Sequence, residues 1–136
     1  MSMNAEIKAR WLAALRSGDY VKTRGRLHRI EDSVDDFGIL ESGYCCLGVL
    51  CDLAKADNIV VEYQADSDSN ASTFGCTDNS EDLSRTTLPE CVVEWSGVSA
   101  DFPSVHRLGH DETLAYINDR PDTTFEQIAD LIEEQL

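Results

Sequence analysis

The stretch Gly43-Tyr-Cys-Cys-Leu-Gly-Val-Leu-Cys-Asp-Leu-Ala-Lys-Ala56 decides the fold of this chain. Four of its apolar residues recur at the spacing of one helical face, which predicts a helix. These residues are Cys46, Val49, Leu50 and Leu53. Small residues such as Gly48 and Ala54 would let neighbouring elements pack closely against that helix. We therefore expect the central core helix here, entered from a strand or turn at Tyr44 and Cys45.

Helix and strand signals alternate along the rest of the chain. Helices are predicted at 4–17, 88–95 and 113–118, and a last helix, capped by Thr123 or Thr124, carries an apolar stripe to Leu136. Strands are predicted at 20–30 and 37–40 as a hairpin, at 59–63 and at 104–108. The polar stretch 66–84 is expected to be a surface loop inserted in a single domain, because neither flank could hold a core alone.

The sequence therefore predicts an α+β fold for residues 1–136. In this fold a small antiparallel sheet packs against about four helices. A chain of 136 residues is long enough to bury a core without disulfides or metals. Six side chains are expected in that core. They are Trp11, Cys46, Leu50, Trp95, Phe125 and Ile128.

The net charge of −15 is unevenly distributed. Residues 1–29 carry seven basic and two acidic side chains, whereas residues 30–136 carry four basic and 24 acidic ones. The acidic part would repel duplex nucleic acid, but it could attract a basic protein surface or mimic nucleic acid. Since no apolar run approaches the ~18 residues of a membrane helix, and the N-terminus is unlike a signal peptide, we expect a cytoplasmic protein without a membrane partner.

The basic residues of the N-terminal part predict an anion-binding site. In a strand over 22–28, four basic groups project from one face, and arginine offers a bidentate fork to phosphate or carboxylate. These groups are Lys22, Arg24, Arg26 and His28, with Arg10 and Arg16 expected nearby. The alternative is that these side chains only neutralise acidic neighbours elsewhere in the fold.

Cysteines and histidines invite catalytic or metal-binding interpretations. Five cysteines without a C-x-x-C pair favour reduced, mostly buried thiols over a disulfide framework or a zinc site. A nucleophilic Cys45 or Cys46 would need a base beside it. His106 and His110 could share a metal in a helix, but Gly109 favours a strand and a turn there. With no phosphate-binding loop or nucleophile elbow, we expect no catalytic residue, no metal and no cofactor.

Several motifs together resemble a family of small proteins encoded by tailed bacteriophages and prophages, mostly without a characterised activity. The match extends over most of the chain except 66–84. The motifs are Arg10-Trp11-x-x-Ala14-Leu15-x-Ser17-Gly18-x-Tyr20, Gly25-x-Leu27, the stretch 43–54, Leu88-Pro89 to Val93-Glu94-Trp95-x-Gly97, Leu114-Ala115-x-Ile117-Asn118-Asp119 and Phe125-x-x-Ile128-Ala129-Asp130-Leu131-Ile132-Glu133. The resemblance implies a phage origin and, as is common for such proteins, a role in managing the host.

Together these features predict a non-enzymatic, phage-encoded binding protein in the cytosol of the bacterial host. Its expected role is counter-defence or host modulation, either by sequestering a small anionic, nucleotide-type signal or by blocking a host protein. The alternatives are an acidic nucleic-acid mimic that inhibits a host protein, a small thiol or metal hydrolase, and a homo-oligomeric assembly role. No duplex nucleic acid is expected as a partner.

Overall fold

The computed structural model of the chain describes residues 3–20, 22, 27–29, 43–63, 73–77, 79–84, 87–98, 103–107, 109–120 and 123–136. For residues 28–29 and 79–84 it describes the backbone alone. The helices are α1 (Ala5–Arg16), α2 (Cys46–Ala56), α3 (Glu90–Ser96), α4 (Leu114–Asp119) and α5 (Phe125–Gln135). The strands are β1 (His28–Arg29), β2 (Gly43–Tyr44), β3 (Val60–Tyr63), β4 (Thr73–Cys76), β5 (Asn79–Ser84), β6 (Ser104–Arg107) and β7 (His110–Thr113).

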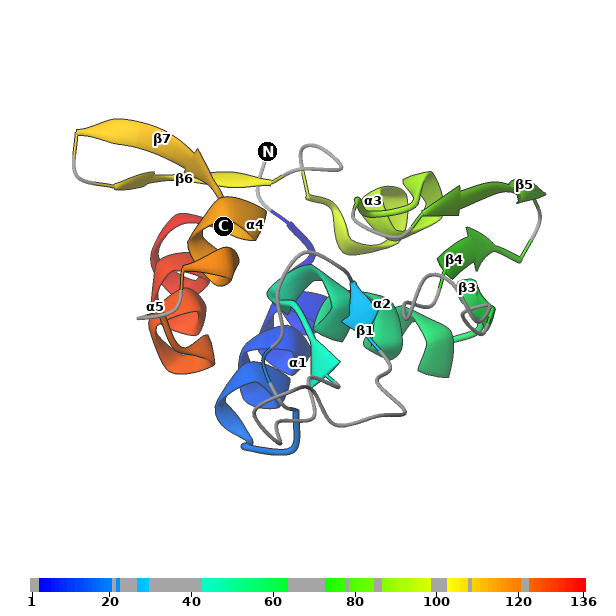
Figure 1. The fold of residues 1–136 in the computed structure, drawn as a ribbon, viewed down its shortest axis with the longest axis horizontal. Helices are drawn as coiled ribbons and strands as arrows, with labels where there is room; N and C mark the ends of the chain where they lie inside the picture. Colours follow the sequence, from blue (N-terminus) through cyan, green and yellow to red (C-terminus); the bar gives the residue numbers. More distant parts are fainter. Residues whose placement is uncertain are drawn as a thin grey trace, which may run out of the picture.

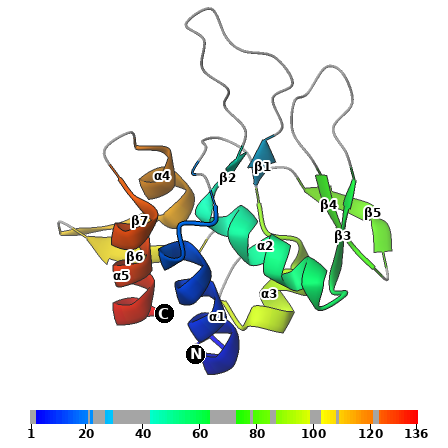
Figure 2. The same cartoon turned by 90° about the horizontal axis from the view of Figure 1, so that it is seen from below.

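Helix α2 is the centre around which the other elements pack (Figures 1 and 2). It contacts α1, α3, α4 and β3, and its first six residues, 46–51, are all buried. Strand β2 leads into it, and the Cys45 Sγ accepts the Gly48 N–H at 3.3 Å, so that Cys45 is the N-cap. The predicted central helix with its short strand entry is therefore confirmed.

Gly48 lets the chain before β1 lie directly against the first turn of α2. The Leu27 carbonyl oxygen accepts the Cys45 N–H at 3.1 Å. A Cβ atom built on Gly48 would lie 1.7 Å from that same oxygen. No side chain fits at this position, so the contact between Leu27 and α2 requires glycine.

Helix α1 lies beside α5, with its inner face on α2 (Figure 2). Asn4 caps its N-terminus by accepting the N–H groups of Glu6 and Ile7 at 3.0 and 3.1 Å. Trp11 is fully buried, and its indole N–H donates to the Cys46 carbonyl oxygen at 2.9 Å. This hydrogen bond fixes the position of α1 against the start of α2.

The fold class is α+β, as the sequence predicts. The single small sheet that was expected is instead divided: the described residues form three separate antiparallel sheets, β1–β2, β3–β4–β5 and β6–β7. The predicted strands at 59–63 and 104–108 correspond to β3 and β6. The predicted hairpin of 20–30 with 37–40 lies mostly outside the described residues; its described strand, β1, pairs with β2.

The expected surface loop at 66–84 is wrong for residues 73–76 and 79–84, which form β4 and β5. Strand β4 is held by its own buried residues, because Phe74 is fully buried and Cys76 is 6% exposed. Its backbone pairs with β3 on one side and β5 on the other, so the polar residues of β5 need contribute only ladder hydrogen bonds. Residues 64–72 and 78 lie outside the described part of the chain.

The cysteines fall into two groups. Cys45, Cys46 and Cys51 are free and buried, as predicted. The prediction of reduced thiols is wrong for Cys76 and Cys91, which form a disulfide that links β4 to α3 across a sequence separation of 15. An odd number of cysteines means that they cannot all be paired, but it still allows one disulfide. A crosslink of this span stabilises a fold by about 3 kcal/mol in the chain-entropy account.

The caps of the C-terminal helices follow the sequence signals. Gly97 ends α3 in the left-handed conformation at φ +79°. Thr124 and Gln127 form a capping box at the start of α5. Five of the six predicted core residues are buried (Trp11, Cys46, Leu50, Phe125 and Ile128). Trp95 is only half-buried and packs at the edge of the core, because it lies at the end of the short helix α3.

Candidate functional site

The predicted basic site is not assembled by the residues that the structure describes. Arg10 forms a bidentate ion pair with Asp57 at the C-terminal end of α2, at 2.8 and 3.2 Å. Its guanidinium carbon also lies 5.9 Å from the centre of a Trp95 ring, in cation–π range. Arg16 donates to Asp130 at 2.8 Å and to Glu133 at 2.9 Å on α5. Both arginines therefore join α1 to neighbouring helices.

Lys22 has a structural role as well. Its ammonium donates to the carbonyl oxygens of Asn118 at 2.7 Å and Arg120 at 3.0 Å. These carbonyls lie at the C-terminal end of α4, where a cation is favourable. Arg24 and Arg26 lie outside the described residues, and His28 is described only as backbone in β1. For Arg10, Arg16 and Lys22, the alternative of internal pairing is the one that the contacts favour.

The ion pair between Arg10 and Asp57 predicts a pH-dependent stability. The Arg10 hydrogen bond lowers the Asp57 pKa below its ordinary value of 3.8. A lowered folded-state pKa stabilises the fold above the unfolded value and ceases to do so as the pH falls through the folded value. We expect Asp57→Asn to lower the unfolding free energy near neutral pH, with a difference from wild type that shrinks below about pH 4. Urea unfolding at several pH values measures this difference; one that stays constant with pH would contradict the assignment.

The free thiols are sealed in the core. Burial raises the pKa of Cys45 to about 11, and it raises the pKa of Cys46 and Cys51 as well. A nucleophilic cysteine needs an accessible thiolate. The geometry of these three thiols instead serves packing and the capping of α2.

His106 lies in β6, as the sequence predicts, and Gly109 lies in a turn; His110 begins a second strand, β7, which the sequence did not predict. In the register of β6 and β7, His106 is opposite Asp111 and Arg107 is opposite His110. Because successive side chains of a strand point to opposite faces, the two imidazoles lie on opposite faces of the hairpin. They cannot share a metal ion. Within the described part of the chain, no three His, Cys, Asp or Glu side chains form a potential metal-binding group.

The face of the hairpin that carries His110 also carries Arg107, and not every guanidinium nitrogen of Arg107 has a hydrogen-bond partner within the described ranges. Arg107 donates through Nε to Glu112 at 3.0 Å, and the other oxygen of Glu112 lies 2.8 Å from His110 Nε2. Burial opposes ionisation of Glu112, yet His110 and Arg107 hold its pKa below the ordinary value. The Arg107 Nη2 is buried and has no hydrogen-bond partner among the described residues. One end of the guanidinium is thus fixed by Glu112, and the other end carries a nitrogen without a partner in the described part of the protein.

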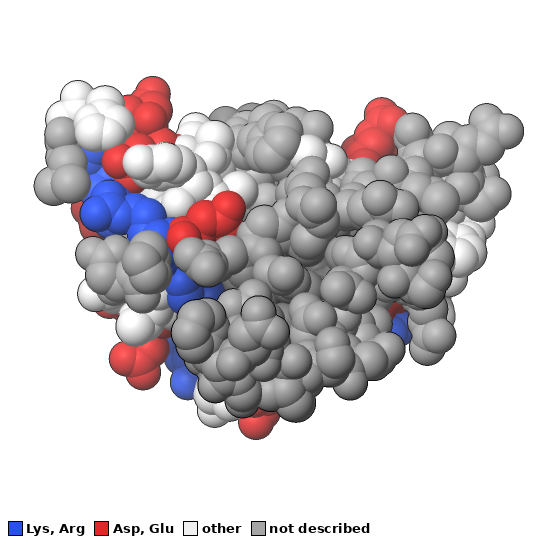
Figure 3. Space-filling model, in the orientation of Figure 1, with Lys and Arg blue, Asp and Glu red and all other residues white. Residues whose placement is uncertain are grey.

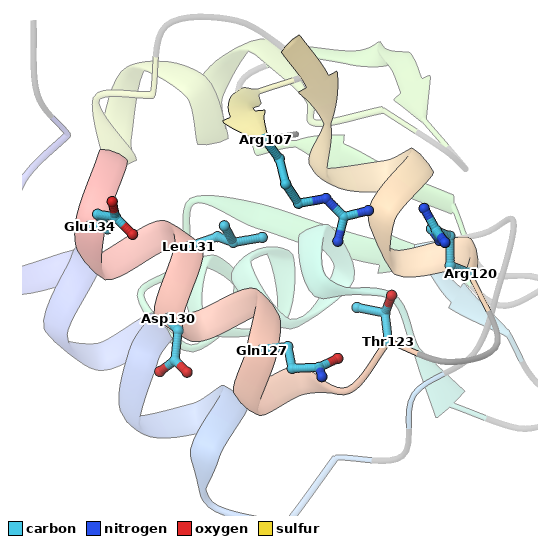
Figure 4. A pocket seen from close by; sticks show the side chains of 7 residues that line it. All are labelled: Arg107, Arg120, Thr123, Gln127, Asp130, Leu131 and Glu134. Atoms are coloured by element: carbon cyan, nitrogen blue, oxygen red, sulfur yellow. The ribbon is translucent and has the colours of Figure 1, made fainter. Parts of the chain in front are cut away.

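A cavity of about 340 Å³ lies beside that guanidinium. Arg120, at the C-cap of α4, reaches it from the opposite side, and Figure 4 shows the Arg107 and Arg120 side chains converging above the Thr123 hydroxyl. The remaining wall comes from one face of α5, since its residues are three, four and seven positions apart. These residues are Gln127, Asp130, Leu131 and Glu134.

The cavity is therefore suited to an anion at its arginine end. Two guanidinium groups and a hydroxyl supply convergent donors, the arrangement that binds phosphate and carboxylate groups. Figure 3 shows basic side chains gathered on this face, over the β6–β7 hairpin and the neighbouring helices, with acidic side chains around them. We name the cavity with its lining residues Arg107, Arg120, Thr123, Gln127, Asp130, Leu131 and Glu134 the arginine pocket.

Sequence reasoning missed this pocket, although one signal was present. Arg107 and Arg120 are two of only four basic residues after position 29, in a segment with 24 acidic ones. In so acidic a segment, an isolated arginine is expected to balance the charge of its neighbours. Their convergence depends on how the hairpin and α4 fold together, which no local pattern encodes.

The model of one protein family matches residues 3–136, nearly the whole chain. The chain belongs to this family, which is described as Domain of unknown function (DUF8296). Comparison with curated proteins and with solved structures gives no match. Among the described residues, no helix combines the length and apolar character needed to cross a membrane.

Proposed function

We propose that the chain is a non-enzymatic binding protein that sequesters a small anionic, nucleotide-type ligand in the arginine pocket. The observation that carries the proposal is the buried, unpartnered Nη2 of Arg107 beside a second guanidinium. A buried donor without a partner costs about 1–3 kcal/mol. An anionic oxygen bound there would satisfy that donor and remove this cost.

The size and the charge of the surroundings favour a small ligand. The cavity of about 340 Å³ is at the lower end of the range for small-molecule sites. The chain as a whole carries a large excess of acidic side chains, which repels extended polyanions such as duplex DNA. A single phosphate or carboxylate group can reach the arginines without approaching the whole acidic surface.

The biological setting that we propose follows from the sequence resemblance to phage and prophage proteins. The chain would act in the cytosol of a bacterial host, where withdrawing a nucleotide-type signal would modulate the host or its defences. In a reducing cytosol the disulfide between Cys76 and Cys91 would open. There the fold would rely on its core and its helix contacts.

Charge removal at Arg120 tests the proposal. We expect Arg120→Gln to weaken binding of inorganic phosphate and of nucleoside monophosphates at least tenfold, because a charge-assisted hydrogen bond is lost. Isothermal titration calorimetry on the folded protein measures the dissociation constants. Arg10→Gln is the matched control, since it removes the same charge at the Asp57 ion pair outside the pocket. Equal losses in both variants, or no binding by the wild type below about 1 mM, would overturn the proposal.

A further inference from the structure

The two ends of the arginine pocket carry opposite charges. Arg107 and Arg120 form one end, next to Gln127 in the first turn of α5. Glu134 forms the other end, seven residues further along the same helix. At 1.5 Å per residue this separates Gln127 from Glu134 by about 10 Å along the helix axis. Figure 4 shows Leu131 between Glu134 and the two arginines.

The two carboxylates of the α5 wall differ in whether another side chain of the protein pairs with them. Asp130 accepts a hydrogen bond from Arg16 at 2.8 Å, so part of its charge is neutralised within the protein. Glu134 has no ion-pair or hydrogen-bond partner among the described residues and is exposed. Glu134 is therefore the acceptor that a ligand reaching out of the pocket would meet.

These features specify more than an anion. A ligand that fills the pocket needs an anionic group at one end, a flat or apolar middle against Leu131, and a hydrogen-bond donor at the other end. A second anionic group at that end would be repelled by Glu134. A free phosphate would use only the arginine end.

We propose that the ligand is a nucleotide whose base carries an exocyclic amino group, with its phosphate on Arg107 and Arg120 and its amino group donating to Glu134. This inference rests on the proposed function of the same pocket. The phosphate then also meets the Thr123 hydroxyl, the ribose lies over Gln127, and the base lies against Leu131. The pocket thus distinguishes bases with an amino group, such as adenine and cytosine, from those with a carbonyl in its place.

Matched nucleotide pairs test this assignment. In IMP the amino group of AMP is replaced by a carbonyl and the neighbouring ring nitrogen, N1, gains a hydrogen; CMP and UMP differ in the same way, at the exocyclic group and at N3. We expect the wild type to bind AMP and CMP about tenfold more tightly than IMP and UMP, the effect of one hydrogen bond to a charged group. Isothermal titration calorimetry, with inorganic phosphate as a further ligand, gives all five affinities.

Substitution of Glu134 tests whether this residue causes the preference for bases with an amino group. Glu134→Ala should bring the AMP to IMP ratio close to one and leave IMP binding unchanged or slightly tighter. Glu126→Ala is the control, because Glu126 is exposed on the same helix and does not line the pocket; it should keep the wild-type ratio.

The outcomes separate this inference from the proposed function. Equal binding of AMP, IMP and inorganic phosphate would overturn the amino-nucleotide assignment and leave the anion site standing. Discrimination that survives in Glu134→Ala would overturn the role of Glu134. If neither phosphate nor any nucleotide binds, both the inference and the proposed function fail.

Discussion

Gly48→Ala is expected to destabilise the protein by about 3 kcal/mol or more, at the upper end of the range for overpacked cores. The added Cβ would lie 1.7 Å from the Leu27 carbonyl oxygen. The obstacle is backbone, so no side-chain rotation relieves it. Either α2 or the segment before β1 must move, and with it the hydrogen bond between Cys45 and Leu27. Urea unfolding followed by circular dichroism measures the loss.

The expected loss of stability in Gly48→Ala is a specific test of the close contact, because its sign is opposite to that of the helix-propensity effect. In an unobstructed helix, glycine to alanine stabilises by about 0.5–1 kcal/mol, so helix propensity alone predicts the opposite change. Gly109→Ala is a useful comparison, since a Cβ there meets nothing within 4 Å and only the positive φ of +88° opposes it. Its cost should stay near 1–2 kcal/mol. A Gly48→Ala protein as stable as the wild type would show that α2 does not need the close approach.

The second large effect is expected at Trp11. Trp11→Ala should cost about 3–5 kcal/mol, because it removes a fully buried indole and leaves a cavity between α1 and α2. It also leaves the buried Cys46 carbonyl without the donor now at 2.9 Å. For a domain of this size that is a large part of the total stability. The midpoint and slope of urea unfolding provide the measurement.

Two further variants help to separate the packing of Trp11 from its hydrogen bond and to compare it with a surface residue. Trp11→Phe keeps most of the apolar volume and loses the hydrogen bond, so we expect a cost of about 1–3 kcal/mol. Tyr116→Ala is the surface control; Tyr116 is 59% exposed and its truncation should change stability by less than about 0.5 kcal/mol. Comparable losses at Trp11 and Tyr116 would contradict the packing described for α1.

Local signals were enough to predict most helices. The caps at Asn4, Thr124 and Gly97 act within a few residues of the chain, so the helices that they bound could be read from sequence. The strands β4 and β5 could not. They lie in a stretch rich in Ser, Asp and Asn, and what makes them strands is the pairing of β4 with β3 and β5 and the burial of Phe74.

The described residues do not assemble the anion-binding site that the sequence predicts. The scarcity of cations in an acidic chain draws attention to each basic residue, but Arg10, Arg16 and Lys22 use their charges to join helices. Whether an arginine is consumed by a neighbour depends on which carboxylate the fold brings next to it. With 26 acidic residues in the chain, sequence offers too many possible partners to decide. Glu112 is hydrogen-bonded to the Nε of Arg107, and the Nη2 has no partner among the described residues.

The division of the cysteines also determines how the protein behaves when it is oxidised. Thiol–disulfide exchange requires an attacking thiolate with access to the bridge. Cys45, Cys46 and Cys51 are buried around α2, so while the chain is folded they cannot compete for the pair formed by Cys76 and Cys91. Unfolding under oxidising conditions removes this protection and makes mispaired bridges accessible. Refolding with all thiols reduced, followed by oxidation of the native state, is the order that preserves the native pairing.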